Sequence, residues 1–72
     1  MTNKELLNER IEKSGMKKSY IAKVLGMAPG SLSRKIASQR DFKASEINAL
    51  CELLGIETLE EKEAIFFAPK VA

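Results

Sequence analysis

The side chains best suited to chemistry in this sequence are basic and hydroxyl groups between residues 17 and 43. Seven cations lie in this stretch against one acidic residue, Asp41, which gives it a net charge of +6. The cations are Lys17, Lys18, Lys23, Arg34, Lys35, Arg40 and Lys43. Residues 44–72 are acidic instead, with six glutamates against two lysines and a net charge of −4. Lysines also solvate ordinary helix faces, but a basic segment of this kind is typical of a nucleic-acid-binding surface.

Enzymatic chemistry has few candidate residues. The sequence has no histidine to act as a general base and a single cysteine, so disulfide frameworks and ordinary zinc sites are excluded. Gly26 and Gly30 do not have the spacing of a phosphate-binding loop. Glu60, Glu61 and Glu63 cluster near the C-terminus, where the pattern is more typical of a solvated helix face than of a carboxylate site. We therefore expect a protein that is not an enzyme and needs no cofactor or metal.

Two short helical patterns position the basic side chains. In the first, from about residue 17 to residue 25, Ile21, Ala22 and Leu25 recur on one face, and Gly26 then ends the helix. In the second, predicted over 29–38, Pro29 suits the first turn. The apolar side of the second helix carries Leu32 and Ile36, and its polar side carries Ser31, Ser33, Arg34 and Lys35. Two helices joined by a glycine turn predict a helix-turn-helix at about 17–38.

The run MKKSYIAKVLGMAPGSLSRKI over residues 16–36 resembles the Cro/repressor-type helix-turn-helix domain of temperate phages. The spacing of Ala22, Gly26 and Leu32 carries most of the resemblance. The later runs DFKASEI (41–47) and IFF (65–67) are similar to small phage switch proteins, so the resemblance covers nearly the whole chain. It implies a regulator of the choice between lysis and lysogeny.

The resemblance also implies roles for individual residues. At the start of the second helix, Pro29, Gly30 and Arg34 match family positions that meet base edges, with Ser31 and Ser33 beside them. Arg34 is the strongest candidate, because arginine pairs bidentately with guanine. The cations that match phosphate-contacting positions are Lys17, Lys18, Arg40 and Lys43. For Lys35, two interpretations are equally expected. The side chain binds a partner, or its aliphatic part packs along the helix while its charge extends into water.

One departure from the family pattern leaves two functions open. Family members that read DNA well often carry amide side chains where this chain has Pro29 and Gly30, and neither residue offers a base a side-chain hydrogen bond. Such a surface suits an antirepressor, a modulator that binds a partner repressor and changes its operator binding, and this function is slightly favoured. The alternative is a Cro-type repressor, a homodimer that reads double-stranded operator DNA through the helix at about 29–38.

The rest of the chain predicts three more helices and an all-α, five-helix, Cro/repressor-like domain over residues 1–67. A capping box from Thr2 to Glu5 is expected to open the first helix. A later helix ending at Leu54 buries one face, formed by Ile47, Leu50, Cys51 and Leu54. A second capping box opens the last helix at Thr58, and residues 68–72 are expected to form a flexible tail.

The last helix also predicts a contact surface. Phe66 and Phe67 are adjacent and therefore point about 100° apart, so that one is expected in the core and the other at a protein interface, although both side chains could instead cover the core. No apolar run is long enough to span a membrane and no secretion leader is evident, which favours a cytoplasmic protein of the bacterial host.

Overall fold

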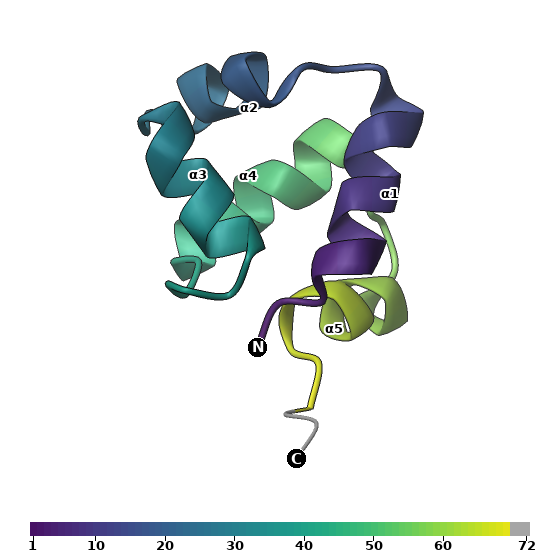
Figure 1. Cartoon of the computed structure of the whole chain (residues 1–72). Helices are drawn as coiled ribbons and strands as arrows, with labels where there is room; N and C mark the ends of the chain where they lie inside the picture. The colour runs from purple at the N-terminus through teal and green to yellow at the C-terminus, as the bar shows by residue number, and fades with distance from the viewer. Residues whose placement is uncertain (70–72) are drawn as a thin grey trace.

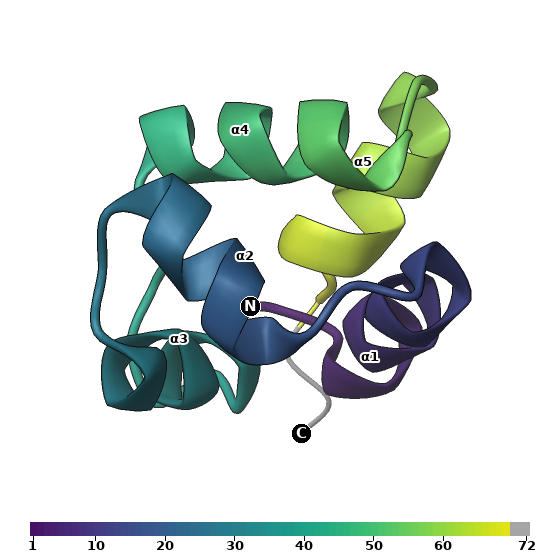
Figure 2. The ribbon, with the colours of Figure 1, turned by 90° about the horizontal axis from the view of Figure 1, so that it is seen from above.

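The computed structural model describes residues 1–69, which form a compact all-α fold (Figure 1). Its five helices are α1 (Lys4–Ser14), α2 (Lys18–Leu25), α3 (Pro29–Ile36), α4 (Ala44–Leu54) and α5 (Leu59–Phe66). Seen from above, α2 and α3 lie together on one side of the molecule and α1 lies on the other, while α4 extends across the top of the view towards α5 (Figure 2). The predicted all-helical class is confirmed.

Every helix contributes to one shared core. The largest fully buried side chains come one from each helix, and they are Leu7, Ile21, Leu32, Leu50 and Ile65. Phe42, in the connection between α3 and α4, packs against Phe66 edge to face, with ring centroids 5.6 Å apart. Burial of these side chains is the main source of stability, because a chain of this length buries little apolar surface.

The helix ends follow local chemistry, with one correction. Gly15, Gly26 and Gly55 end α1, α2 and α4 in the left-handed conformation that glycine adopts without strain. The capping box predicted at Thr2 is wrong. Asn3 is the N-cap of α1, and its side-chain oxygen accepts a hydrogen bond from the Leu6 N–H at 3.1 Å.

Thr2 is buried instead, because the N-terminal segment is tied into the fold. Its carbonyl accepts a hydrogen bond from the Ser38 hydroxyl at 2.7 Å. The Asn3 N–H donates to the Ile65 carbonyl at 2.6 Å, and the Ala68 N–H donates to the Met1 carbonyl at 2.9 Å. The first residues therefore join α3 to the end of α5. Of the predicted tail at 68–72, residues 70–72 lie outside the described part of the chain.

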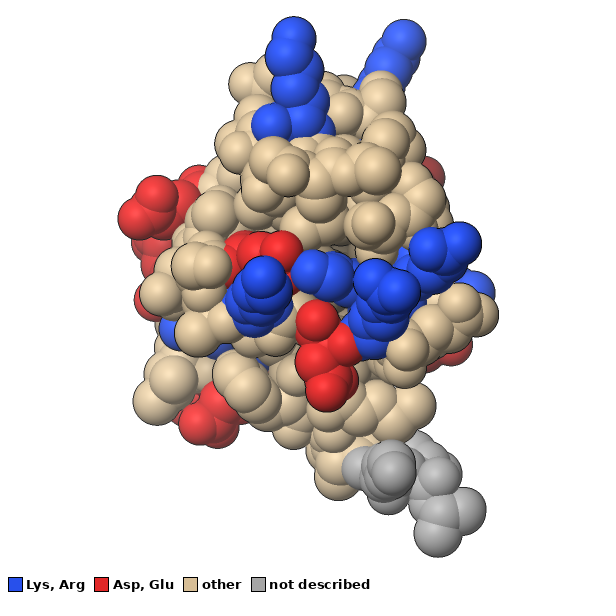
Figure 3. Space-filling view, turned by 90° about the vertical axis from the view of Figure 1, so that its left-hand side faces the viewer, with Lys and Arg blue, Asp and Glu red and all other residues tan. Residues whose placement is uncertain are grey.

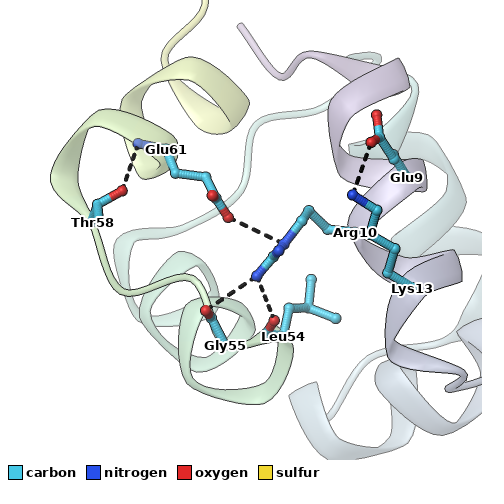
Figure 4. A network of polar contacts seen from close by, with 7 residues as sticks. All are labelled: Glu9, Arg10, Lys13, Leu54, Gly55, Thr58 and Glu61. Atoms are coloured by element: carbon cyan, nitrogen blue, oxygen red, sulfur yellow. Dashed lines mark hydrogen bonds and ion pairs between the residues drawn. The ribbon is translucent and has the colours of Figure 1, made fainter.

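Arg10 holds α1, α4 and α5 together (Figure 4). Its guanidinium donates to the carbonyls of Leu54 and Gly55 at 3.0 and 3.1 Å, and its Nε lies 3.1 Å from a carboxylate oxygen of Glu61. A cation here satisfies carbonyls that the end of α4 leaves without partners and complements its dipole. Thr58 caps α5 as predicted, by accepting from the Glu61 N–H at 3.2 Å. Within residues 1–69, no helix is long and apolar enough to cross a membrane.

Candidate binding surfaces

Helices α2 and α3 pack against each other across a tight turn. The turn is closed by backbone hydrogen bonds from Gly26 to the Lys23 carbonyl (3.1 Å) and from Met27 to the Ala22 carbonyl (3.0 Å). Ile21 and Ala22 of α2, like Leu32 and Ile36 of α3, are buried. The opposite sides of both helices therefore face solvent.

The start of α3 is an open surface without polar side chains. Ala28, Pro29 and Gly30 are exposed, and the N-cap, Ala28, has no side-chain hydrogen bond to the helix. A Cβ built at Gly30 would meet nothing within 4 Å, so packing does not require glycine there. One turn later Ser33 and Arg34 are exposed, while Ser31 is half-buried. Arg34, in the last turn of α3, is therefore the exposed charged side chain of this helix.

All four predicted phosphate-binding cations are exposed around these helices. Cationic side chains project from the top of this face, over α2, and others lie across its middle beside carboxylates (Figure 3). The exposed residues of the predicted set are Lys17, Lys18, Arg40 and Lys43. The face is therefore basic overall but interrupted by acidic groups.

Lys35 is not part of this exposed surface. Its Nζ lies 2.7 and 2.9 Å from the two carboxylate oxygens of Glu46, and the two side chains are only 11% and 14% exposed. The predictions that Lys35 meets a partner or extends its charge into water are therefore wrong. The prediction failed because Glu46 is eleven residues away in sequence and on another helix, so no local pattern shows the pair.

The carboxylate of Glu46 is held in its charged form. Partial burial, the largest single effect, acts to raise the pKa of Glu46. The hydrogen bond and charge of Lys35, together with the backbone N–H of Lys43 at 2.8 Å, outweigh burial and lower this pKa below its ordinary value of 4.5. The ion pair thus fastens α3 to the first turn of α4.

Two exposed apolar pairs are the second kind of candidate surface. On α2, Tyr20 and Val24 are 51% and 48% exposed, four residues apart on one face. At the other end of the chain, Leu59 and Phe67 are 67% and 57% exposed. The Tyr20–Val24 pair was missed in the sequence, although its i, i+4 spacing opposite Ile21 and Ala22 is a visible signal.

Phe66 and Phe67 divide between core and surface. Phe66 is 4% exposed and packs on Phe42, so it is the one of the two that enters the core, and it is no longer a candidate for an interface. Phe67 is exposed and remains a candidate. Leu59, at the start of α5, is also outside the core.

Residues 1–69 offer no evident site for metal binding or for thiol chemistry. No cluster of three or more acidic, histidine or cysteine residues could hold a metal ion there. Cys51 is half-buried against the core, and burial raises the pKa of its thiol, which disfavours the reactive thiolate. No known protein family, curated protein or solved structure matches this chain.

Proposed function

We propose that this protein is an antirepressor of a temperate phage, which binds a partner repressor and alters its operator binding. The observation that carries the proposal is the exposure of two large apolar side chains of the C-terminal part, Leu59 at 67% and Phe67 at 57%. Exposed large apolar groups favour a protein contact, because a protein partner removes them from water and a phosphate backbone does not.

The start of α3 supports the same function. Direct reading of bases requires side-chain donors and acceptors in the groove. At the leading end of α3, Pro29 and Gly30 offer neither, and Lys35 is bound to Glu46. The chain resembles a DNA-binding helix-turn-helix whose reading residues are reduced, as expected of a regulator that acts through another protein.

The family resemblance supplies the setting. The Cro/repressor-type pattern, and the narrower similarity to the modulator of repression of lactococcal temperate phages, support a role in the choice between lysis and lysogeny in the host cytoplasm. If a longer, divergently transcribed gene lies beside this one, its product is the repressor to test.

Binding between the two proteins without DNA tests the proposal. Isothermal titration calorimetry of this chain with the neighbouring repressor is expected to show a saturable complex of defined stoichiometry. A parallel titration of this chain alone with operator DNA is expected to show no specific binding at the same concentrations. The proposal is wrong if the two proteins do not associate and this chain alone binds the operator tightly and specifically.

A Cro-type repressor is the second candidate, and the exposure of Arg34 favours it. Lys17, Lys18, Arg40 and Lys43 are also exposed around α2 and α3 and are available for phosphates. In this function, two copies of the chain form a homodimer that binds double-stranded operator DNA. It requires specific DNA binding by this chain alone, which the antirepressor function does not.

A further inference from the structure

The outward face of α5 combines two large apolar side chains with carboxylates. At about 100° per residue, Leu59, Glu60, Glu63, Ala64 and Phe67 project within an arc of roughly 140°, and all five are exposed. Ile65 projects the other way, into the core, while Phe66, about 20° from Leu59 on the same scale, is buried at the edge of this arc. The helix thus has one buried side and one side that nothing in residues 1–69 covers.

The charge around this face is acidic after internal ion pairs are accounted for. Of the glutamates in the second half of the chain, Glu46 pairs with Lys35 and Glu61 pairs with Arg10. The exposed ones on α5 are Glu60 and Glu63, while Glu52 on α4 and Glu57 in the α4–α5 connection are exposed elsewhere. Lys62, on the same helix, is half-buried and donates to the Asn48 side chain at 3.1 Å. The uncovered face therefore presents an apolar pair accompanied by negative charge.

We infer that this α5 face, with Phe67 near its centre, Glu60 and Glu63 on either side and Leu59 at its edge, docks on the DNA-contacting surface of the partner repressor. The inference rests on the proposed antirepressor function and names the surface that performs it. A repressor's DNA-contacting surface must be basic, because it neutralises phosphates. The acidic face of α5 complements that surface, and its glutamates occupy the place of the phosphates.

The charge distribution excludes the opposite docking mode. The exposed apolar pair on α2, Tyr20 and Val24, is accompanied on its own helix by Lys18 and Lys23, with Lys17 at the N-cap. Like charges placed across an interface cost several kcal/mol. The α2–α3 face therefore repels a basic DNA-contacting surface, and the two ends of this molecule have different partners or uses.

Matched pairs of variants test which face docks. The first variant combines Leu59→Ser with Phe67→Ser, and its control combines Val24→Ser with Tyr20→Ser, which removes an exposed apolar pair from α2. The second variant is Glu63→Lys, and its control is Glu12→Lys, an exposed glutamate of α1. Circular dichroism and thermal melting check the fold of all four variants. We expect each to fold as the natural chain does, because none of the changed side chains is buried.

The measured quantity is the dissociation constant for the neighbouring repressor, by calorimetry at two salt concentrations. We expect each α5 variant to bind about tenfold more weakly or worse, and each control to bind like the natural chain. Rising salt should weaken natural binding, and less so for Glu63→Lys. The repressor should bind this chain or the operator, never both, in a competition experiment.

Three results would overturn the inference while leaving the antirepressor function intact. In the first, the α2 control loses binding and the α5 variants do not. In the second, this chain binds a repressor that is still bound to its operator. DNA then occupies the repressor's DNA-contacting surface, so this chain must dock elsewhere. In the third, sedimentation shows that Leu59 and Phe67 hold two copies of this chain together and the repressor binds elsewhere. If the natural chain does not bind the repressor at all, the proposed function fails and the inference fails with it.

Discussion

Glu46 connects two helices and the loop between them through a single carboxylate. It accepts hydrogen bonds from the Lys35 ammonium, 2.7 Å away, and from the backbone N–H of Lys43, 2.8 Å away. Both side chains of the ion pair are largely buried, so removing one leaves the other without a partner in a poorly solvated place. The orientation of α3, and with it the direction of Arg34, depends on this contact.

The pair predicts a specific dependence of stability on pH. Because the folded state lowers the pKa of Glu46, its stabilisation is fully present above the unfolded value, 4.5, and is lost as pH falls through the lower folded pKa. Glu46→Gln should reduce the free energy of unfolding by roughly 1–3 kcal/mol at neutral pH. The difference from the natural chain should then shrink towards zero in acid.

Urea denaturation at a series of pH values measures this difference. The matched control is Glu12→Gln, on the exposed side of α1, which should leave the free energy of unfolding almost unchanged at every pH. A Glu46→Gln deficit that is equally large in acid and at neutral pH would show that the ion pair is not the cause.

Residue-level predictions from sequence succeeded where the signal was local. Gly26, Pro29 and Thr58 were placed correctly at helix ends, because each acts on its own backbone. Lys35 was misplaced because its partner is on another helix. Thr2 was misplaced because Asn3, one residue later, is the N-cap and Thr2 is buried.

At the scale of elements, all five helices could be predicted, because each carries apolar side chains at helical spacing. The predicted end of α3 at residue 38 is wrong: α3 ends at Ile36, where no glycine marks the end. Which of two adjacent apolar residues is buried was harder to predict. Phe66 and Phe67 differ only in direction, and that direction is set by the packing of Phe66 on Phe42 from a distant loop. For the same reason the uncovered face of α5 could be suspected from the sequence but not mapped.

Helix α4 is the element whose burial is most directly testable. Leu50 is fully buried at its centre, so Leu50→Ala should reduce the free energy of unfolding by roughly 2–5 kcal/mol. Lys4→Ala, on the exposed side of α1, should be nearly silent. Urea denaturation measures the free energy of unfolding of both variants. A loss below about half a kcal/mol at Leu50 would place α4 outside the core.

At the scale of the whole molecule, charge is segregated. The exposed cations of the predicted set lie around α2 and α3, and exposed glutamates accompany α5. This asymmetry was visible in the sequence as segments of +6 and −4. The charge that remains for a partner could not be predicted from the sequence, because only the fold shows that Arg10 pairs with Glu61 and that Lys35 pairs with Glu46.

The basic end of the molecule makes a separate prediction for the Cro-type alternative. If this chain alone binds duplex DNA, its affinity should fall steeply with salt. Arg34→Ala should then reduce preference for the operator over other sequences by about 1–3 kcal/mol. Lys17→Ala should weaken binding to all sequences alike, because a phosphate contact carries no base information. Fluorescence anisotropy with operator and scrambled duplexes checks both variants, and an equal loss of preference would contradict these roles.

The most direct test of the antirepressor function is a mobility shift of the neighbouring repressor on its operator, titrated with this protein. Binding of this chain to the repressor predicts release of the operator, or a changed complex, at concentrations where this chain alone shifts no DNA. The opposite result would contradict the proposed function: this chain shifts the operator alone, tightly and specifically, and the repressor–operator complex is unaffected at every concentration.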